Sequence, residues 1–170
     1  MVHASEGPTL SLLNYSREAS DSRRGTVLLP HASFHLGAPI TRLQRISWAG
    51  GGAAAGAAAG VAARRNGLLW ASTDGSIGFV APLSESDFRR LAFLATKMAV
   101  GLPQPAGLHP RAFRADKTRA ASARELKNMV DGQLMGRFLE LSAEDQQRLA
   151  MQIGSTPRNV FTALVELLEG

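Results

Sequence analysis

The 170-residue sequence contains no cysteine. Disulfide bonds and thiolate metal sites are therefore excluded, and the composition fits a reducing compartment. The opening residues, MVHASEGPTL, lack the basic and then apolar pattern of a secretory signal, so we expect none. No run of about 18 strongly apolar residues occurs, and we therefore expect no membrane span.

Catalytic signatures are also missing. The chain has no Walker loop, no G-x-G-x-x-G and no G-x-S-x-G. His31 and His35 have H-x-x-x-H spacing, but they lack the glutamate of the metalloprotease motif and lie in turn-and-strand sequence. Glu144 and Asp145 fall in the first turn of an expected helix, where carboxylates complement the helix dipole. We therefore expect no enzyme, no cofactor, no metal and no small-molecule substrate.

The residues that are present indicate a globular chain with a localised positive charge. Hydrophobic residues make up 45% and charged residues 19%, and the formal net charge is +5. Between positions 104 and 127, six cationic and two acidic side chains leave a net charge of +4. Such a segment favours phosphates or an acidic protein surface, with a solvated loop as the plainer alternative.

The stretch AGLHPRAFR, residues 106–114, lies inside this basic segment. Its prolines and glycine predict irregular structure. Leu108 and Phe113 would anchor it, while its arginines would face carboxylates, backbone carbonyls or RNA phosphate. The candidate contacts with nucleic acid or a partner are Arg111, Arg114, Lys117 and Arg119.

The first half of the chain reads as short strands. Short apolar or alternating segments predict strands at 9–15, 25–30 and 38–49. Two further runs, 68–73 and 76–83, flank Asp74 and Gly75. Asp-Gly between such runs predicts a hairpin in which both turn residues have positive φ. The Gly- and Ala-rich residues 50–60 carry no side chain for chemistry and indicate a flexible surface insertion.

The second half reads as helices. Ser84 and Asp87 suggest a capping box, followed by apolar residues on one helical face. Ser122 and Glu125 predict a second helix that carries Met129 and Val130, and Asp131-Gly132 is expected to interrupt and re-cap it. Further starts and stops are predicted at Ser142, Gly154 and Thr156-Pro157.

Strands first and helices last predict an α+β chain. We expect residues 1–83 to form the β part, with the insertion at 49–63. Residues 84–170 would form the helical part, with a basic loop at 103–121. Four or five short strands make little more than one propeller blade, so unpaired sheet edges are expected.

Three segments of the sequence, in this order, resemble a known family: RNGLLWASTDGSIGFVAPLSESDFRRL, AGLHPRAFR and NMVDGQLMGRFLELSAEDQQRLAMQIGSTP. They resemble the carboxyl-terminal region of the large subunits of the cleavage and polyadenylation specificity factor. SFHLGAPI, at residues 33–40, is similar to the family's strand before the final blade. The chain departs from the family in its Ala/Gly insertion and at Gln133, where an acidic residue is expected.

The resemblance implies the last blade or so of a seven-bladed β-propeller, followed by an all-α region. It implies a non-catalytic nuclear scaffold in pre-mRNA 3′-end processing, with the other polyadenylation factor subunits as partners and RNA contacted through the complex. It also implies a protein several times longer, so the isolated chain would be poorly soluble or partly molten. The alternative is a nucleic-acid-binding module like the damaged-DNA-binding or spliceosomal sister propellers.

Overall fold

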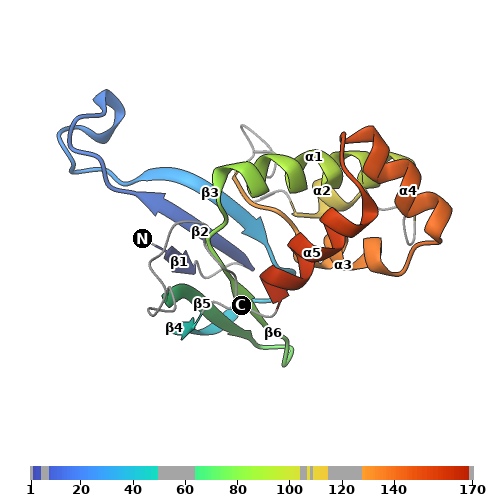
Figure 1. Ribbon diagram of the computed structural model, residues 1–170. Coiled ribbons are helices and arrows are strands. Elements are labelled where there is room, and N and C mark those ends of the chain that lie inside the picture. Colours follow the sequence, from blue (N-terminus) through green and yellow to red (C-terminus); the bar gives the residue numbers. More distant parts are fainter. Residues whose placement is uncertain are drawn as a thin grey trace. The chain divides into compact units, whose positions relative to one another are not determined.

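A computed structural model describes residues 2–4, 8–49, 64–103, 107, 109–114 and 128–168. Within this part the protein is α+β, with two three-stranded sheets and five α-helices (Figure 1). The α+β class expected from the sequence is confirmed. Close packing divides the chain into two compact units, one drawn from 1–43, 70–77 and 103–129, the other from 44–69, 78–102 and 130–170. The domain division at residue 83 stays a prediction.

The first sheet contains β1 (Val2–Ala4), β2 (Thr9–Asn14) and β3 (Leu29–His35) in that order, with antiparallel pairing. Strand β2 lies where the sequence predicts it, whereas β1 was not anticipated. The expected strand at 25–30 is only partly confirmed, because residues 23–26 form a turn and β3 begins at Leu29. Arg23, Arg24 and Gly25 all have positive φ, which is incompatible with an extended strand.

Strand β3 carries an irregularity beside its proline. Leu12 pairs with Ala32 and Leu13 with Pro30, so His31 is an extra residue on β3. This arrangement is a β-bulge. Proline cannot donate to a strand ladder and is found at edge strands and bulges, and β3 is an edge strand of this sheet.

The second sheet contains β4 (Ile40–Ala49), β5 (Arg64–Ser72) and β6 (Ile77–Val80). With the first sheet this gives six strands in the described residues, not the four or five expected. The turn between β5 and β6 also differs from the prediction, because Gly75 has a φ of 85° while Asp74 is not among the positive-φ residues. Gly75 donates to the Ser72 carbonyl, and Ser72 donates to the Ser76 carbonyl. The loop therefore has three residues and ends on a left-handed glycine, rather than two residues with positive φ.

The helices are α1 (Glu85–Gly101), α2 (Pro110–Arg114), α3 (Gly132–Leu139), α4 (Ala143–Gln152) and α5 (Pro157–Leu168). Helix α2 corrects the prediction that AGLHPRAFR is irregular throughout. Pro110 occupies the first helical position, where its missing N–H is not needed. Met129 and Val130, predicted to be helical, lie outside any helix. Ser122, Glu125, Leu108 and the insertion at 50–63 lie outside the described residues.

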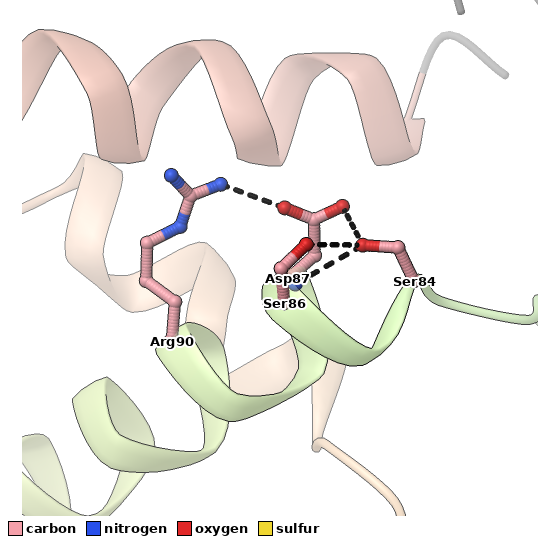
Figure 2. A network of polar contacts seen from close by, with 4 residues as sticks. All are labelled: Ser84, Ser86, Asp87 and Arg90. Atoms are coloured by element: carbon pink, nitrogen blue, oxygen red, sulfur yellow. Dashed lines mark hydrogen bonds and ion pairs between the residues drawn. The ribbon is translucent and has the colours of Figure 1, made fainter.

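The start of α1 shows how the sequence specifies a helix end (Figure 2). Ser84 is the N-cap, and its hydroxyl accepts the Asp87 backbone N–H at 3.1 Å. In a capping box the Asp87 carboxylate would reach the Ser84 backbone, but here it accepts from the Ser84 hydroxyl at 2.6 Å. Aspartate is one methylene shorter than glutamate, which accounts for the closer partner. The other carboxylate oxygen accepts from Arg90 at 2.8 Å.

Four helices form the larger hydrophobic core. Helix α1 contacts α3 and α4, and α5 contacts both of these as well. The expected apolar face of α1 is confirmed, since Leu91, Leu94, Met98 and Leu102 are buried. The rest of this core is supplied by Leu134, Met135, Phe138, Leu149, Ala150, Val160 and Leu164. Apolar burial of this kind is the main favourable contribution to folding.

Candidate functional site

Part of the basic segment packs on the edge strand β3. Helix α2 contacts β3, and both lie in the same compact unit. Leu36 donates its backbone N–H to the Pro8 carbonyl, so the neighbouring His35 directs its carbonyl away from β2. Arg114 donates to that His35 carbonyl at 3.1 Å. A side chain thus satisfies an edge acceptor that no strand pairs.

The Arg114 side chain is 7% exposed and lies among aromatic rings. Its guanidinium carbon is 4.7 Å from the centre of the Phe34 ring and 5.0 Å from that of the Phe113 ring. These are cation–π distances, and guanidinium is the cation most often found in such contacts. The Phe113 and His35 rings meet edge to face, with centroids 5.8 Å apart and planes at 86°. Arg114 is therefore enclosed by protein.

A second side chain reaches β3 from the residue that follows the basic segment. Asn128 donates through Nδ2 to the carbonyl of His31, the bulge residue, at 3.0 Å. The φ of Asn128 is 54°, a left-handed conformation that asparagine tolerates better than most residues. We call Phe113, Arg114 and Asn128 the β3 clamp. The clamp attaches α2 and the residue after the segment to one edge strand.

The four cationic candidates occupy different environments. Arg114 belongs to the β3 clamp, whereas Arg111 is half-buried on α2 and makes interactions of its own. Lys117 and Arg119 lie outside the described residues. Their contact with nucleic acid or a partner stays a prediction. Phe34 and Asn128 were missed by sequence reasoning, which considered only the histidines of β3 and the apolar residues after position 128.

The four turn and cap candidates lie at element ends. Asp131 is the N-cap of α3, and its carboxylate accepts the Gln133 N–H at 3.0 Å, while Gly132 is the first helical residue. Asp74 lies in the β5–β6 turn next to Gly75. The Ser72 hydroxyl and the Ser76 backbone N–H hold the pKa of the Asp74 carboxyl below its ordinary value of 3.8. Hydrogen bonds donated to a carboxylate favour its charged form.

The described residues offer neither a cluster of metal ligands nor a membrane-spanning helix. No group of three or more His, Asp or Glu side chains there could hold a metal ion. None of the described helices is both long and apolar enough to span a bilayer. His31 and His35 lie on a strand, where four-residue spacing separates side chains far more than it does on a helix.

The sequence of this chain matches a known protein family. Residues 4–140 match the model of the CPSF A subunit region. The cleavage and polyadenylation specificity factor subunit 1 of Arabidopsis thaliana is 34% identical over 166 residues, covering 97% of this chain and 11% of the relative. A probable subunit 1 of Caenorhabditis elegans is 31% identical over 95% of this chain and covers 11% of that relative.

A fungal relative matches a shorter part. The protein cft1 of Neurospora crassa is 38% identical over 95 residues, covering 51% of this chain and 6% of the relative. The chain thus spans about one-ninth of the length of its plant and nematode relatives, which are matched over 11% of their sequences. The family match over residues 4–140 and the identity across nearly all of the chain show that this protein belongs to the CPSF A subunit region family.

Proposed function

We propose that this chain is part of a non-catalytic scaffold subunit of the nuclear complex that cleaves and polyadenylates mRNA precursors. The observation that carries the proposal is similarity to relatives named for this process across 97% and 95% of the chain. On this proposal the protein acts by holding other subunits in place.

On this proposal both sheets belong to the same β-propeller. We assign them to the end of a β-propeller, whose blades are small antiparallel sheets, and the helices after residue 83 to the family's helical carboxyl-terminal region. The antiparallel pairing of β1, β2 and β3 supports this assignment. Exposed Ile77 and Phe79 on β6 are the kind of apolar surface that further propeller structure would cover.

Within such a scaffold, we propose separate tasks for the basic residues. Arg114 holds the segment on β3, since its guanidinium is buried and bonded to the His35 carbonyl. Contact with other subunits, or with pre-mRNA through the complex, then falls to Arg111, Lys117 and Arg119. Arginine and lysine suit either acidic protein surfaces or phosphate.

The test is to tag the protein at its full natural length and identify its companions by mass spectrometry after purification from nuclei. Recovery of the cleavage and polyadenylation subunits supports the proposal, and their absence from a well-expressed, intact protein contradicts it. A triple variant, R111A/K117A/R119A, tests the contact surface. It should lose some companions while the matched variant R89A/R148A, which removes exposed helix-surface arginines, keeps them all.

A further inference from the structure

The loop between β2 and β3 projects beyond the ends of both strands (Figure 1). It is closed by its own hydrogen bonds around Ser22, which is 0% exposed. The Ser22 hydroxyl donates to the Ala19 carbonyl at 2.7 Å and accepts the Gly25 N–H at 3.2 Å. The Val27 N–H also donates to the Ser22 carbonyl, at 3.0 Å. This bonding gives the loop one defined backbone conformation.

Two adjacent arginines occupy the strained part of the loop. Arg23 has a φ of 48° and Arg24 a φ of 61°, both left-handed. For residues with a Cβ this conformation costs roughly 1–2 kcal/mol each. Glycine would remove that cost, yet the only glycine in the turn is Gly25. Strained backbone is concentrated at functional sites in proteins, and the side chains that this turn carries are the two arginines.

Both arginine side chains are exposed and available. In the described part of the chain, neither guanidinium forms a hydrogen bond or an ion pair. Because backbone hydrogen bonds hold the residues on both sides of the pair, the Cα positions of the two arginines are fixed. Two adjacent guanidinium groups suit phosphate oxygens, which they bind with paired N–H donors.

An aromatic ring lies against the turn that carries this arginine pair. Tyr15 is 66% exposed, and it is the only tyrosine in the chain. A Cβ added at Gly25 would lie 2.8 Å from the Tyr15 hydroxyl and 3.0 Å from its Cε2, so the ring lies against the turn that follows Arg24. An exposed ring next to fixed cations is the combination that binds unpaired bases and their phosphates.

We propose that Tyr15, Arg23 and Arg24 form a direct binding site for single-stranded nucleic acid. A base stacks on Tyr15, and its neighbouring phosphates contact the two arginines. The site belongs to this chain alone, so it does not depend on the scaffold role proposed above. Duplex should bind more weakly, because its bases are already stacked and cannot cover the ring.

The experiment measures binding of fluorescent single strands of about twelve nucleotides, a typical site length, to the protein at its full natural length. RNA, DNA and duplex probes are titrated over a range of salt concentrations. The variant R23G/R24G keeps a backbone that tolerates positive φ, so its melting temperature should be unchanged or higher. Loss of two phosphate contacts should make the log–log salt slope shallower by about 1.4.

The tyrosine is tested in parallel. Tyr15→Ala should weaken single-strand binding about fivefold or more, whereas Tyr15→Phe keeps the ring and should retain the affinity. RNA and DNA strands differ at the 2′-hydroxyl, so their relative affinities identify the natural ligand. The charge-matched control is R42A/R45A, which removes two exposed arginines from β4 and should change the slope less.

Several outcomes would overturn the proposal. These are a chain that binds no single strand, loop variants that bind like the parent, and a control variant that lowers the slope as much as R23G/R24G. Displacement of the probe by polyglutamate at equal charge would assign the loop to an acidic protein instead. Ultraviolet crosslinking of RNA to the full-length natural protein gives a second reading, since the crosslinked peptide should contain Tyr15.

Discussion

Arg114 donates a hydrogen bond to the backbone carbonyl of His35, a residue 79 positions earlier in the chain. This contact closes the edge of β3 with a side chain instead of another strand. Unpaired edges invite association with other chains, and covering them is a common solution. The buried guanidinium and the rings of Phe34 and Phe113 make the contact more than a surface bond.

Replacing Arg114 by alanine should therefore destabilise the protein. The change leaves the His35 carbonyl without its donor and removes the stacked guanidinium, at a cost of about 2–3 kcal/mol. Lysine should rescue only part of the loss, because it lacks the planar fork. Urea denaturation gives the free energy of unfolding. Arg89→Ala, at an exposed ion pair, is the control and should change it by less than about 0.5 kcal/mol. Equal effects at both positions would contradict the assigned role of Arg114.

The helical core predicts a contrast between two phenylalanines. Phe138 is 1% exposed, whereas Phe161 on α5 is 53% exposed. Phe138→Ala should lower the free energy of unfolding by about 3–5 kcal/mol, because it removes buried contacts and leaves a cavity. Phe161→Ala should cost less than about 1 kcal/mol. Thermal melting of both variants checks the prediction, which fails if Phe138→Ala melts like the parent.

The turn at Asp74 predicts an acid-side pH dependence. Its folded pKa lies below the ordinary 3.8, first because of the Ser72 hydroxyl and then because of the Ser76 N–H. The stabilisation is therefore present above the unfolded pKa and is lost as pH falls through the folded pKa. NMR titration of the Asp74 carboxyl should show the lowered pKa, and Ser72→Ala should move it back upward. An unchanged pKa in Ser72→Ala would contradict the stated cause.

Two glycines should respond to alanine in opposite directions. Gly136 lies inside α3 with open space around an added Cβ, so Gly136→Ala should stabilise by about 0.5–1 kcal/mol. Gly154 also has open space, but its φ of 67° ends α4 in the left-handed region. Gly154→Ala should destabilise by about 1 kcal/mol through backbone strain alone. Chemical denaturation of both variants measures the two signs, and two changes of the same sign would refute the account.

Local chemistry accounts for the elements that the sequence predicted well. The N-caps Ser84 and Ser142 each bond a backbone N–H three residues later, and Thr156 bonds Asn159 before the proline-initiated α5. Each of these signals acts within one helical turn. The apolar spacing of α1 likewise identifies its buried face without knowledge of its partners.

Errors arose where a residue's role depends on groups beyond its own turn. The Arg23–Gly25 turn replaced the start of a predicted strand, because Ser22 organises a loop that hydrophobic pattern alone does not reveal. The β5–β6 turn has three residues because hydrogen bonds to Asp74 and the Ser72–Ser76 pairing favour that geometry over two positive-φ residues. Proline at the first position of α2 likewise starts a helix where it was expected to prevent one.

The sequence by itself determined the α+β class, the starts of α1, α3, α4 and α5, and the family, because these depend on spacing and on residues close together in the chain. Tertiary structure alone decided that Arg114 is buried in the β3 clamp and that Tyr15 lies beside Gly25. Both relationships join residues that lie ten or more positions apart in the chain. Their approach depends on the conformation of the β2–β3 loop and on where α2 packs. The sequence thus shows where a cationic side chain lies in the chain. Its surroundings in the fold decide whether it stabilises the protein, as Arg114 does, or is exposed to a ligand.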